Sequence, residues 1–443
     1  MDILIKAAQF LLSLSLLIII HEMGHFIFAK IFKCRVEKFY LFFDAGFSLF
    51  KTKKGETEYG IGWLPLGGYV KISGMIDESM DKEQMKQPEQ PWEFRSKKAY
   101  QRLLIMVGGV LMNFIAALII YIGVLYVWGD EYLPNDNVKY GIEVNDVGRE
   151  IGFHNGDKIL LVDGKPVEDF YNIIPTIVLD GAGTVKVDRN GRSVLITITE
   201  DDVAKIVKES RSIIGVRTPF KMEVTGFGKE SPALEAGLEK GDEIVMINHQ
   251  HFDFYDQCKA VLDENKGKTV DVTVKRNGED ISYPVTLTSE GMLGITRDLS
   301  YLANVFEWKT LHYGFWESIP AGIKRGWETS VDYIKQFKLI FNRKTKGYES
   351  LGGFITIGNI FPAMWNWHKF WDMTAFLSLI LGIMNILPIP ALDGGHVMFV
   401  LYEMITGRKP NDKFLEYAQY VGLTILLLLV LYANINDVIR LFK

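Results

Sequence analysis

Four long apolar stretches constrain this chain more than any other feature of its sequence. They lie at about residues 3–32, 103–127, 372–397 and 416–435. A helix needs roughly 20 apolar residues to cross a hydrocarbon core about 30 Å thick, and each stretch is long enough. The first stretch is not followed by a small-residue cleavage site, so we interpret it as a retained helix rather than a signal peptide. The sequence therefore predicts a polytopic α-helical membrane protein with four transmembrane helices.

Basic residues near the helix ends predict which side of the membrane each loop faces. They gather in the loop between the first two helices and in the short loop after the third: Lys33, Arg35, Lys38, Lys51, Lys53, Lys54, Arg95, Lys97, Lys98, Arg102, Arg408, Lys409 and Lys413. By the positive-inside rule both loops face the cytoplasm. The large segment between the second and third helices is then expected on the extracytoplasmic side, as are both termini.

The apolar stretches divide the chain into a membrane part and an intervening segment. Residues 1–127 and 371–443 form the predicted membrane part, and the segment between them has the composition of a soluble protein. The formal net charge of the whole chain is −5, which gives no reason to expect a nucleic-acid partner.

An internal repeat occupies much of the intervening segment. Asp157 and Asp242 each follow a glycine and precede an apolar run, and Arg189 and Arg276 each precede an Asn-Gly pair. Asn-Gly between alternating apolar residues is typical of a β-hairpin turn. Both copies are therefore expected to be rich in strands.

The second copy closely resembles bacterial PDZ domains. It carries Ser-Pro-Ala at 231–233 and Gly-Asp at 241–242. We predict two tandem α+β PDZ domains, at 128–218 and 219–300. PDZ domains typically bind an extended peptide or a C-terminus as an added strand. The alternative, that these domains are spacers or steric shields without a peptide ligand, stays open, since fold does not fix function.

Residues 301–370 are predicted to be a linker that contains an amphipathic helix at about 312–342. Apolar residues recur there at steps of three and four: Trp316, Ile319, Ile323, Trp327, Val331, Ile334, Phe337 and Phe341. Such a helix could lie in the membrane interface or pack on the protein's own domains.

The first apolar stretch contains a candidate metal site. His21 and His25 enclose Glu22 in the pattern His-Glu-x-x-His. Residues four apart share one helical face, so both imidazoles can reach one zinc ion. Glu22 can then take a proton from water that the metal activates. Ionisable groups within a membrane span are costly, which favours a functional role over a chance arrangement.

The third apolar stretch offers a third metal ligand. Catalytic zinc usually has three protein ligands. Pro388 and Pro390 are predicted to break the helix, and Asp393 follows them as a carboxylate at membrane depth. Binding zinc would neutralise its charge. The alternative is that Asp393 merely caps a helix in the interface.

Together these motifs resemble the site-2 protease family of intramembrane zinc metalloproteases. The resemblance rests on HEMGH at 21–25 and NILPIPALDGG at 385–395, and it covers the whole chain in order. Two PDZ domains between the second and third spans resemble the RseP subgroup, the regulators of sigma-E protease. Gly108, Gly109 and Asn113 look like a glycine–asparagine motif of the second span in this family.

The resemblance implies roles for individual residues. It implies one Zn²⁺ ion bound by His21, His25 and Asp393, with Glu22 as the general base. It also implies that Asn385 binds substrate, with Pro388 and Pro390 as its neighbours in the substrate-binding motif.

The resemblance further implies a membrane-associated β-hairpin at about 57–72. Its segment with Gly67, Gly68 and Tyr69 is expected to pair with an unwound substrate strand, which would satisfy the substrate's backbone groups inside the membrane. The alternative for the two glycines is a simple turn.

The expected function is cleavage of transmembrane segments in the bacterial cytoplasmic (inner) membrane. Substrates of this subgroup are single-span membrane proteins, such as a pre-cleaved anti-sigma factor, and remnant signal peptides. A non-catalytic membrane scaffold built around PDZ domains is the rival hypothesis. It predicts that Glu22 and Asp393 are dispensable.

Overall fold

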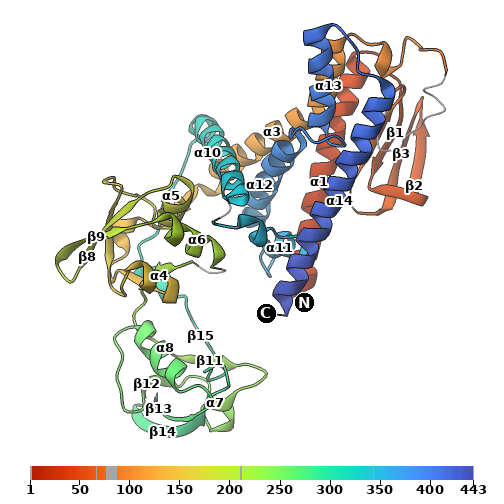
Figure 1. The fold of residues 1–443 in the computed structure, drawn as a ribbon. Helices are drawn as coiled ribbons and strands as arrows, with labels where there is room; N and C mark the ends of the chain where they lie inside the picture. Colours follow the sequence, from red (N-terminus) through yellow and green to blue (C-terminus); the bar gives the residue numbers. More distant parts are fainter. Residues whose placement is uncertain (1, 66, 76–86, 210–211, 343, 443) are drawn as a thin grey trace. The chain divides into compact units, whose positions relative to one another are not determined.

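The computed structural model describes residues 2–65, 67–75, 87–209, 212–342 and 344–442. The chain divides into two compact units, which we call the helical unit and the strand-rich unit (Figure 1). The helical unit comprises Met1–Gly129, His312–Phe337 and Tyr348–Lys443, and the strand-rich unit comprises Asp130–Leu311 and Lys338–Gly347.

The helical unit contains helices that can cross a membrane. Among the described residues, three helices are long and apolar enough: α1 (Asp2–Ile31), α3 (Ala99–Trp128) and α14 (Asp412–Leu441). The predicted third span is instead two helices, α12 (Trp367–Asn385) and α13 (Asp393–Thr406). The break lies where the prolines predict it. Because α12 and α13 are each shorter than the three long helices, the total of four transmembrane spans stays a prediction.

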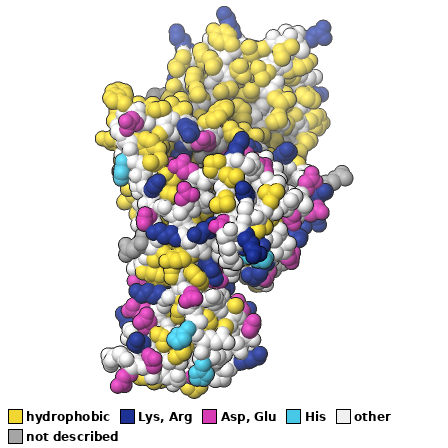
Figure 2. Space-filling model, turned by 90° about the vertical axis from the view of Figure 1, so that its left-hand side faces the viewer, with side chains coloured by type: hydrophobic (Ala, Val, Ile, Leu, Met, Phe, Trp, Pro, Cys, Tyr) yellow, Lys and Arg dark blue, Asp and Glu magenta, His cyan; other side chains and the backbone are white. Residues whose placement is uncertain are grey.

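Hydrophobic side chains gather over the long helices in the space-filling view, whereas charged side chains of both signs are interspersed over the strand-rich unit (Figure 2). On α14 the exposed side chains include Leu427, Leu428 and Leu431. An apolar surface of this kind is expected where helices face lipid rather than water.

Helices α1 and α3 cross at very short range. A Cβ atom at Gly24 would lie 2.2 Å from the carbonyl oxygen of Gly108, so only glycine fits there. Small residues allow such close approach of helices within a membrane. The crossing brings α3 directly against the His-Glu-x-x-His segment of α1.

The loop after α1 folds into a four-stranded sheet. Its strands are β1 (Val36–Leu41), β2 (Phe43–Lys54), β3 (Thr57–Leu64) and β4 (Tyr69–Ile72), in the order β2-β3-β1-β4. Strand β1 is parallel to β3 and antiparallel to β4. The predicted hairpin of residues 57–72 is therefore wrong, because β1 lies between β3 and β4.

Close packing explains why β3 and β4 do not form a hairpin. A Cβ atom at Gly68 would lie 2.5 Å from Cγ2 of Ile18 in α1 and 2.8 Å from the carbonyl oxygen of Tyr40 in β1. The chain therefore passes over the end of β1 and against α1 instead of turning back. The hairpin of this sheet joins β2 to β3, with Gly55 at φ +65° between them.

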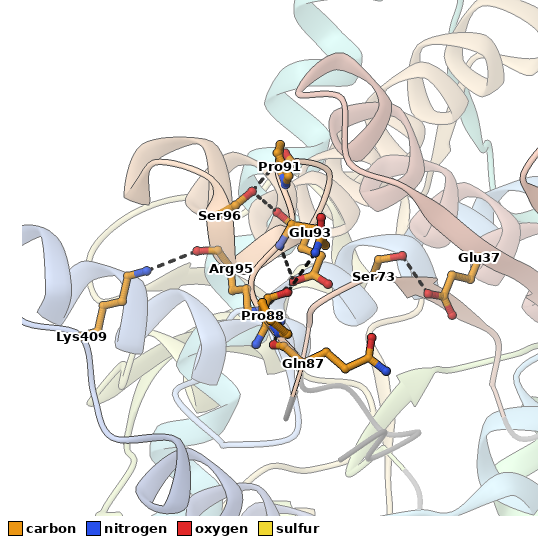
Figure 3. Close-up of polar contacts among 10 residues, drawn as sticks. Glu37, Ser73, Gln87, Pro88, Pro91, Glu93, Arg95, Ser96 and Lys409 are labelled. Atoms are coloured by element: carbon orange, nitrogen blue, oxygen red, sulfur yellow. Dashed lines mark hydrogen bonds and ion pairs between the residues drawn. The ribbon is translucent and has the colours of Figure 1, made fainter. Parts of the chain in front are cut away.

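The end of β4 is fixed by polar contacts (Figure 3). The Ser73 hydroxyl donates to Glu37 at 2.8 Å, and the backbone N–H of Phe94 donates to the Ser73 carbonyl at 2.8 Å. The buried carboxylate of Glu93 accepts a hydrogen bond from Arg95 at 2.6 Å. Strand β4 is thus held at its end although it forms an edge of the sheet.

The predicted amphipathic helix is present as α10 (Phe315–Phe341). Its small residues face α3: a Cβ atom at Gly322 would lie 2.5 Å from Ile122, and one at Gly326 would lie 2.7 Å from Leu118. The two tryptophans of the apolar stripe are not covered, since Trp316 is 78 % and Trp327 is 71 % exposed. One face of α10 therefore packs on the protein itself. Placement of the apolar stripe in the membrane interface stays a prediction.

The strand-rich unit consists of two halves with the same arrangement of strands. Each half has a two-stranded and a three-stranded antiparallel sheet with its own apolar core. The first half contains β6 (Ile142–Val144), α4 (Asp146–Ile151), β7 (Lys158–Val162), α5 (Ile173–Leu179), β8 (Thr184–Arg189), β9 (Arg192–Thr197), α6 (Glu200–Lys208) and β10 (Ile214–Val216). The second half contains β11 (Val224–Phe227), α7 (Pro232–Glu235), β12 (Glu243–Ile247), α8 (Tyr255–Glu264), β13 (Thr269–Arg276), β14 (Glu279–Thr286) and β15 (Ile295–Arg297).

Short elements complete both units. Strands β5 (Asp130–Tyr132) and β16 (Lys309–Leu311) pair with each other in the strand-rich unit, which also contains α9 (Leu302–Val305). Helix α11 (Phe354–Asn359) precedes α12 in the helical unit.

The repeated residues make equivalent ion pairs in the two halves. Arg189 donates two hydrogen bonds to Asp157, at 2.8 and 2.7 Å, and Arg276 donates two to Asp242, both at 2.7 Å. Both carboxylates are buried, and the hydrogen bonds from Arg276 hold the pKa of Asp242 below its usual range. The repeated Asp and Arg residues thus have the same structural role in both α+β halves. The assignment of these halves as PDZ domains stays a prediction.

Candidate metal centre

Helix α1 and the start of α13 bring three potential ligands together. His21 and His25 are 9 % and 7 % exposed, and their Nε2 atoms are 3.3 Å apart. The Oδ2 atom of Asp393 lies 3.2 Å from Nε2 of His21 and 3.3 Å from Nε2 of His25. The three residues that the sequence predicts as metal ligands therefore form one compact group.

The dimensions of this group fit a zinc ion. Bonds of about 2.0–2.1 Å in a tetrahedral arrangement set ligand atoms about 3.3–3.4 Å apart, close to the observed separations. The buried Oδ2 atom of Asp393 has no hydrogen-bond partner among the described residues. A carboxylate oxygen in that position is costly unless a cation compensates it. A metal ion shared with both imidazoles would provide that compensation.

Hydrogen bonds fix the orientation of both imidazoles. Nδ1 of His25 lies 2.9 Å from the carbonyl oxygen of Ile105, and Nδ1 of His21 lies 3.0 Å from the side-chain amide of Asn113. An imidazole that binds metal through Nε2 carries its proton on Nδ1 and donates it to such a partner. The Ile105 carbonyl accepts that proton from His25. At His21 the nearer Asn113 atom is Nδ2, and the Oδ1 atom has no partner among the described residues, so a 180° flip of this amide supplies the matching acceptor.

Gly109 leaves the space that the two imidazoles occupy. A Cβ atom on this residue would lie 2.4 Å from Nε2 of His25 and 2.7 Å from Cε1 of His21. Helix α3 can therefore support the ligands only because position 109 has no side chain.

Gly109→Ala is expected to lower zinc affinity by about 10–100-fold, the range typical of disturbed support for metal ligands. The added methyl group must displace at least one imidazole. Zinc content at buffered free zinc measures the effect. Gly123→Ala is the matched control, because a Cβ atom at this position of the same helix meets nothing within 4 Å. Equal zinc affinity of the two variants would contradict the proposed geometry.

Glu22 faces strand β4. Gly68, just before this strand, approaches Glu22 closely: a Cβ atom there would lie 3.5 Å from Cγ of Glu22, and the backbone of Val70 in β4 lies near the carboxylate. This carboxylate therefore lies between the metal ligands on its own helix and the free edge of the sheet.

Asn385 ends α12 beside the ligands. Its Nδ2 atom lies 3.3 Å from Nε2 of His21. The following segment contains Pro388 and Pro390, and Ala391 has a φ of +90°, a strained conformation for a residue with a side chain. The two prolines shape the connection that turns Asp393 toward the imidazoles.

The other predicted substrate residues have different surroundings. A Cβ atom at Gly68 would lie 2.5 Å from Ile18 of α1, whereas one at Gly67 would lie 2.9 Å from the ring of Phe43. Tyr69 donates a hydrogen bond to Asp44 at 2.9 Å and stacks on Tyr40, so its side chain belongs to the sheet. Any contact of Tyr69 with a substrate would therefore involve its backbone.

Asn113, Gly109 and the carbonyl of Ile105 support the two imidazoles, and the sequence assigned no such role to any of them. Asn113 is an amide in a span without charged residues, which is a signal for a buried polar partner. Gly109 belongs to the same motif, but its function depends on the distance between two helices. The carbonyl of Ile105 could not have been found, since every residue has one.

The comparison with known families agrees with this site. The chain belongs to peptidase family M50, whose model matches residues 9–429. This match confirms the resemblance to the site-2 proteases.

Curated relatives match the chain over nearly its whole length. The regulator of sigma E protease of Haemophilus influenzae is 29 % identical over 460 residues, which cover 100 % of both chains. The regulator of sigma-E protease RseP of Escherichia coli is 28 % identical over 457 residues, or 98 % of both chains. A putative zinc metalloprotease of Neisseria meningitidis is 29 % identical over 457 residues, also 98 % of both chains.

Proposed function

We propose that this protein is an intramembrane zinc metalloprotease of the RseP type, which hydrolyses peptide bonds within transmembrane segments. The observation that carries the proposal is the group formed by His21, His25 and Asp393, whose three ligand atoms lie 3.2–3.3 Å apart within the helical unit. Family membership and the names of the relatives support it.

Each residue of the centre has a distinct role in this reaction. His21, His25 and Asp393 hold one zinc ion, which supplies Lewis-acid polarisation of the reacting groups. Glu22 accepts a proton from the attacking water while the oxygen of that water bonds to the scissile carbonyl carbon. Glu22 then returns the proton to the peptide nitrogen as the C–N bond breaks. The amide of Asn385 donates to the substrate oxygen on which negative charge develops.

Strand β4 is the proposed binding site for the substrate backbone. It pairs with β1 on one side, and no described strand occupies its other edge. Glu22 lies at this free edge, near Gly68 and Val70. A substrate that adds as a strand here satisfies its backbone groups and presents an extended peptide bond to the base.

Substrates with a weaker helix are expected to be cut faster, because the segment must unwind before it pairs with β4. A glycine costs a helix about 0.8–1.0 kcal/mol relative to alanine, which corresponds to about fivefold in kcat/KM per glycine near the cleaved bond. The rates are measured with otherwise identical transmembrane substrates. The control places the glycine at the end of the segment. Equal rates for all of these substrates would rule out unwinding onto β4.

The names of the relatives, regulators of sigma-E protease, support a proposal for the physiological substrates. We propose that this protein cuts single-span membrane proteins of the anti-sigma-factor type after a first cleavage, and remnant signal peptides. The bilayer is the bacterial inner membrane, with the strand-rich unit and both termini on the periplasmic side, as the basic loops favour. The two PDZ domains exclude substrates with bulky extracytoplasmic domains, and a peptide ligand for them stays an alternative.

Metal removal tests the proposed function. Purified protein in proteoliposomes is expected to cleave a transmembrane substrate within its apolar segment, to stop when a chelator removes zinc, and to resume when zinc is restored. The cleavage products are identified by mass spectrometry. A scaffold without catalytic activity would cleave nothing under any of these conditions. Cleavage that persists in fully metal-free protein would contradict the proposed chemistry.

A further inference from the structure

A buried ion pair joins α3 to α13 at a distance from the metal centre. Nη2 of Arg102 lies 2.5 Å from Oε1 of Glu403, and the two side chains are 10 % and 14 % exposed. The Nε of Arg102 also donates to the carbonyl of Lys97 at 3.1 Å. Glu403 follows Asp393 by ten residues in the same helix, or about 15 Å along its axis. The pair therefore connects the helix that carries a metal ligand to the helix that supports the other two.

Helix α13 packs against α3, and an irregular segment rather than a continuous helix joins it to α12. It begins after the break at 386–392, and its N-cap residue Leu392 makes no side-chain capping bond. At its other end, Lys409 in the loop to α14 donates to the carbonyl of Arg95 at 3.2 Å (Figure 3). The segment that precedes and opens α3 thus holds the far end of α13 by two contacts.

The same segment also holds β4, the strand proposed to bind the substrate backbone. Arg95 binds Glu93, and the neighbouring Phe94 N–H donates to Ser73 at the end of β4. Residues 93–102 therefore contact both the strand proposed to bind substrate and the helix that carries Asp393. A displacement of this segment would therefore move both β4 and Asp393.

We propose that Arg102 and Glu403 are positioning residues, which hold α13 in the rotation and register that bring Asp393 to the two imidazoles. The inference rests on the proposed function of the metal centre. Two paired charges in a buried site contribute little stability beyond what two apolar side chains would give. Their hydrogen-bonded contact is directional, and apolar side chains of similar volume cannot reproduce that direction.

Cobalt-substituted protein provides the test, because its visible absorption reports the coordination geometry without any catalytic turnover. Glu403→Gln and Arg102→Met are expected to weaken cobalt and zinc binding about tenfold, at the lower end of the effect of lost ligand support, and to change the absorption spectrum. Arg102→Lys keeps the charge and is expected to remain within about threefold of the wild type. Arg325→Met is the matched control: its guanidinium forms a 2.8 Å ion pair with Asp372, 29 % and 12 % exposed, that joins α10 to α12.

The double variant Arg102→Met/Glu403→Met separates positioning from stability. It removes both charges, so its thermal stability is expected to return to about that of the wild type. Its metal affinity and spectrum are expected to remain altered. Wild-type affinity and spectrum in the double variant or in Glu403→Gln would overturn the inference. A wild type that binds no cobalt, or a His21→Ala variant that binds it equally well, would overturn the proposed function and this inference with it.

Discussion

Glu22→Gln is expected to keep its zinc and to lose proteolysis by about 10²–10⁴-fold, the usual contribution of one general base. The amide has nearly the same size as the carboxylate and fits the same position beside Gly68 and Val70. It cannot accept the proton of the attacking water. The measurement compares kcat/KM and zinc content in the same preparation.

Glu56→Gln is the control for this substitution. Glu56 lies in the turn between β2 and β3, pairs with Lys30 and is half exposed, so its loss is expected to leave both quantities unchanged. Cleavage near the wild-type rate by zinc-loaded Glu22→Gln would remove Glu22 from the mechanism.

Asp393→Ala is expected to lower zinc affinity by more than about 100-fold, beyond what the loss of a merely supporting residue costs. The variant retains only two of the three protein ligands that catalytic zinc usually has. Zinc per chain is measured after dialysis against nanomolar free zinc. Asp372→Ala removes another buried carboxylate of the helical unit and is expected to keep the metal.

Full zinc occupancy of Asp393→Ala would mean that the third ligand lies elsewhere. Two neighbours in α13 would then have to be considered. His396 follows Asp393 by three residues, and Glu403 would have to leave its ion pair with Arg102. Separate substitution of each residue in the Asp393→Ala background would identify the replacement.

Much of the centre could be predicted from local patterns. The spacing of His21 and His25 places them on one helical face, and a carboxylate after two prolines marked Asp393. Asp157 and Arg189 were also visible as recurring positions of the repeat, although their ion pair was not predicted. Such features depend on a few neighbouring residues or on a repeat, so the sequence contains them.

The order of strands could not be predicted in this way. The segment at 57–72 has two strands in succession, and consecutive strands are adjacent in space only about two-thirds of the time. Here β1 takes the place between β3 and β4, since the tight fit of Gly68 against Ile18 carries the chain across. The partner of a strand edge depends on packing with α1, which no local pattern reports.

The same limit applies to long-range polar contacts. Arg102 and Glu403 are separated by 301 residues in the chain, and their charges looked like ordinary loop-facing residues near helix ends. The acceptor for His25 is a backbone carbonyl 80 residues away. Both contacts become visible only when α3 is packed against its neighbours.

X-ray absorption at the zinc edge of Glu22→Gln protein tests the central claim most directly. The predicted first shell contains two imidazole nitrogens and carboxylate oxygen at about 2.0–2.2 Å, and the same measurement on Asp393→Ala should lose the carboxylate contribution. A shell with sulfur at about 2.3 Å, or with a single imidazole, would contradict a centre built from His21, His25 and Asp393.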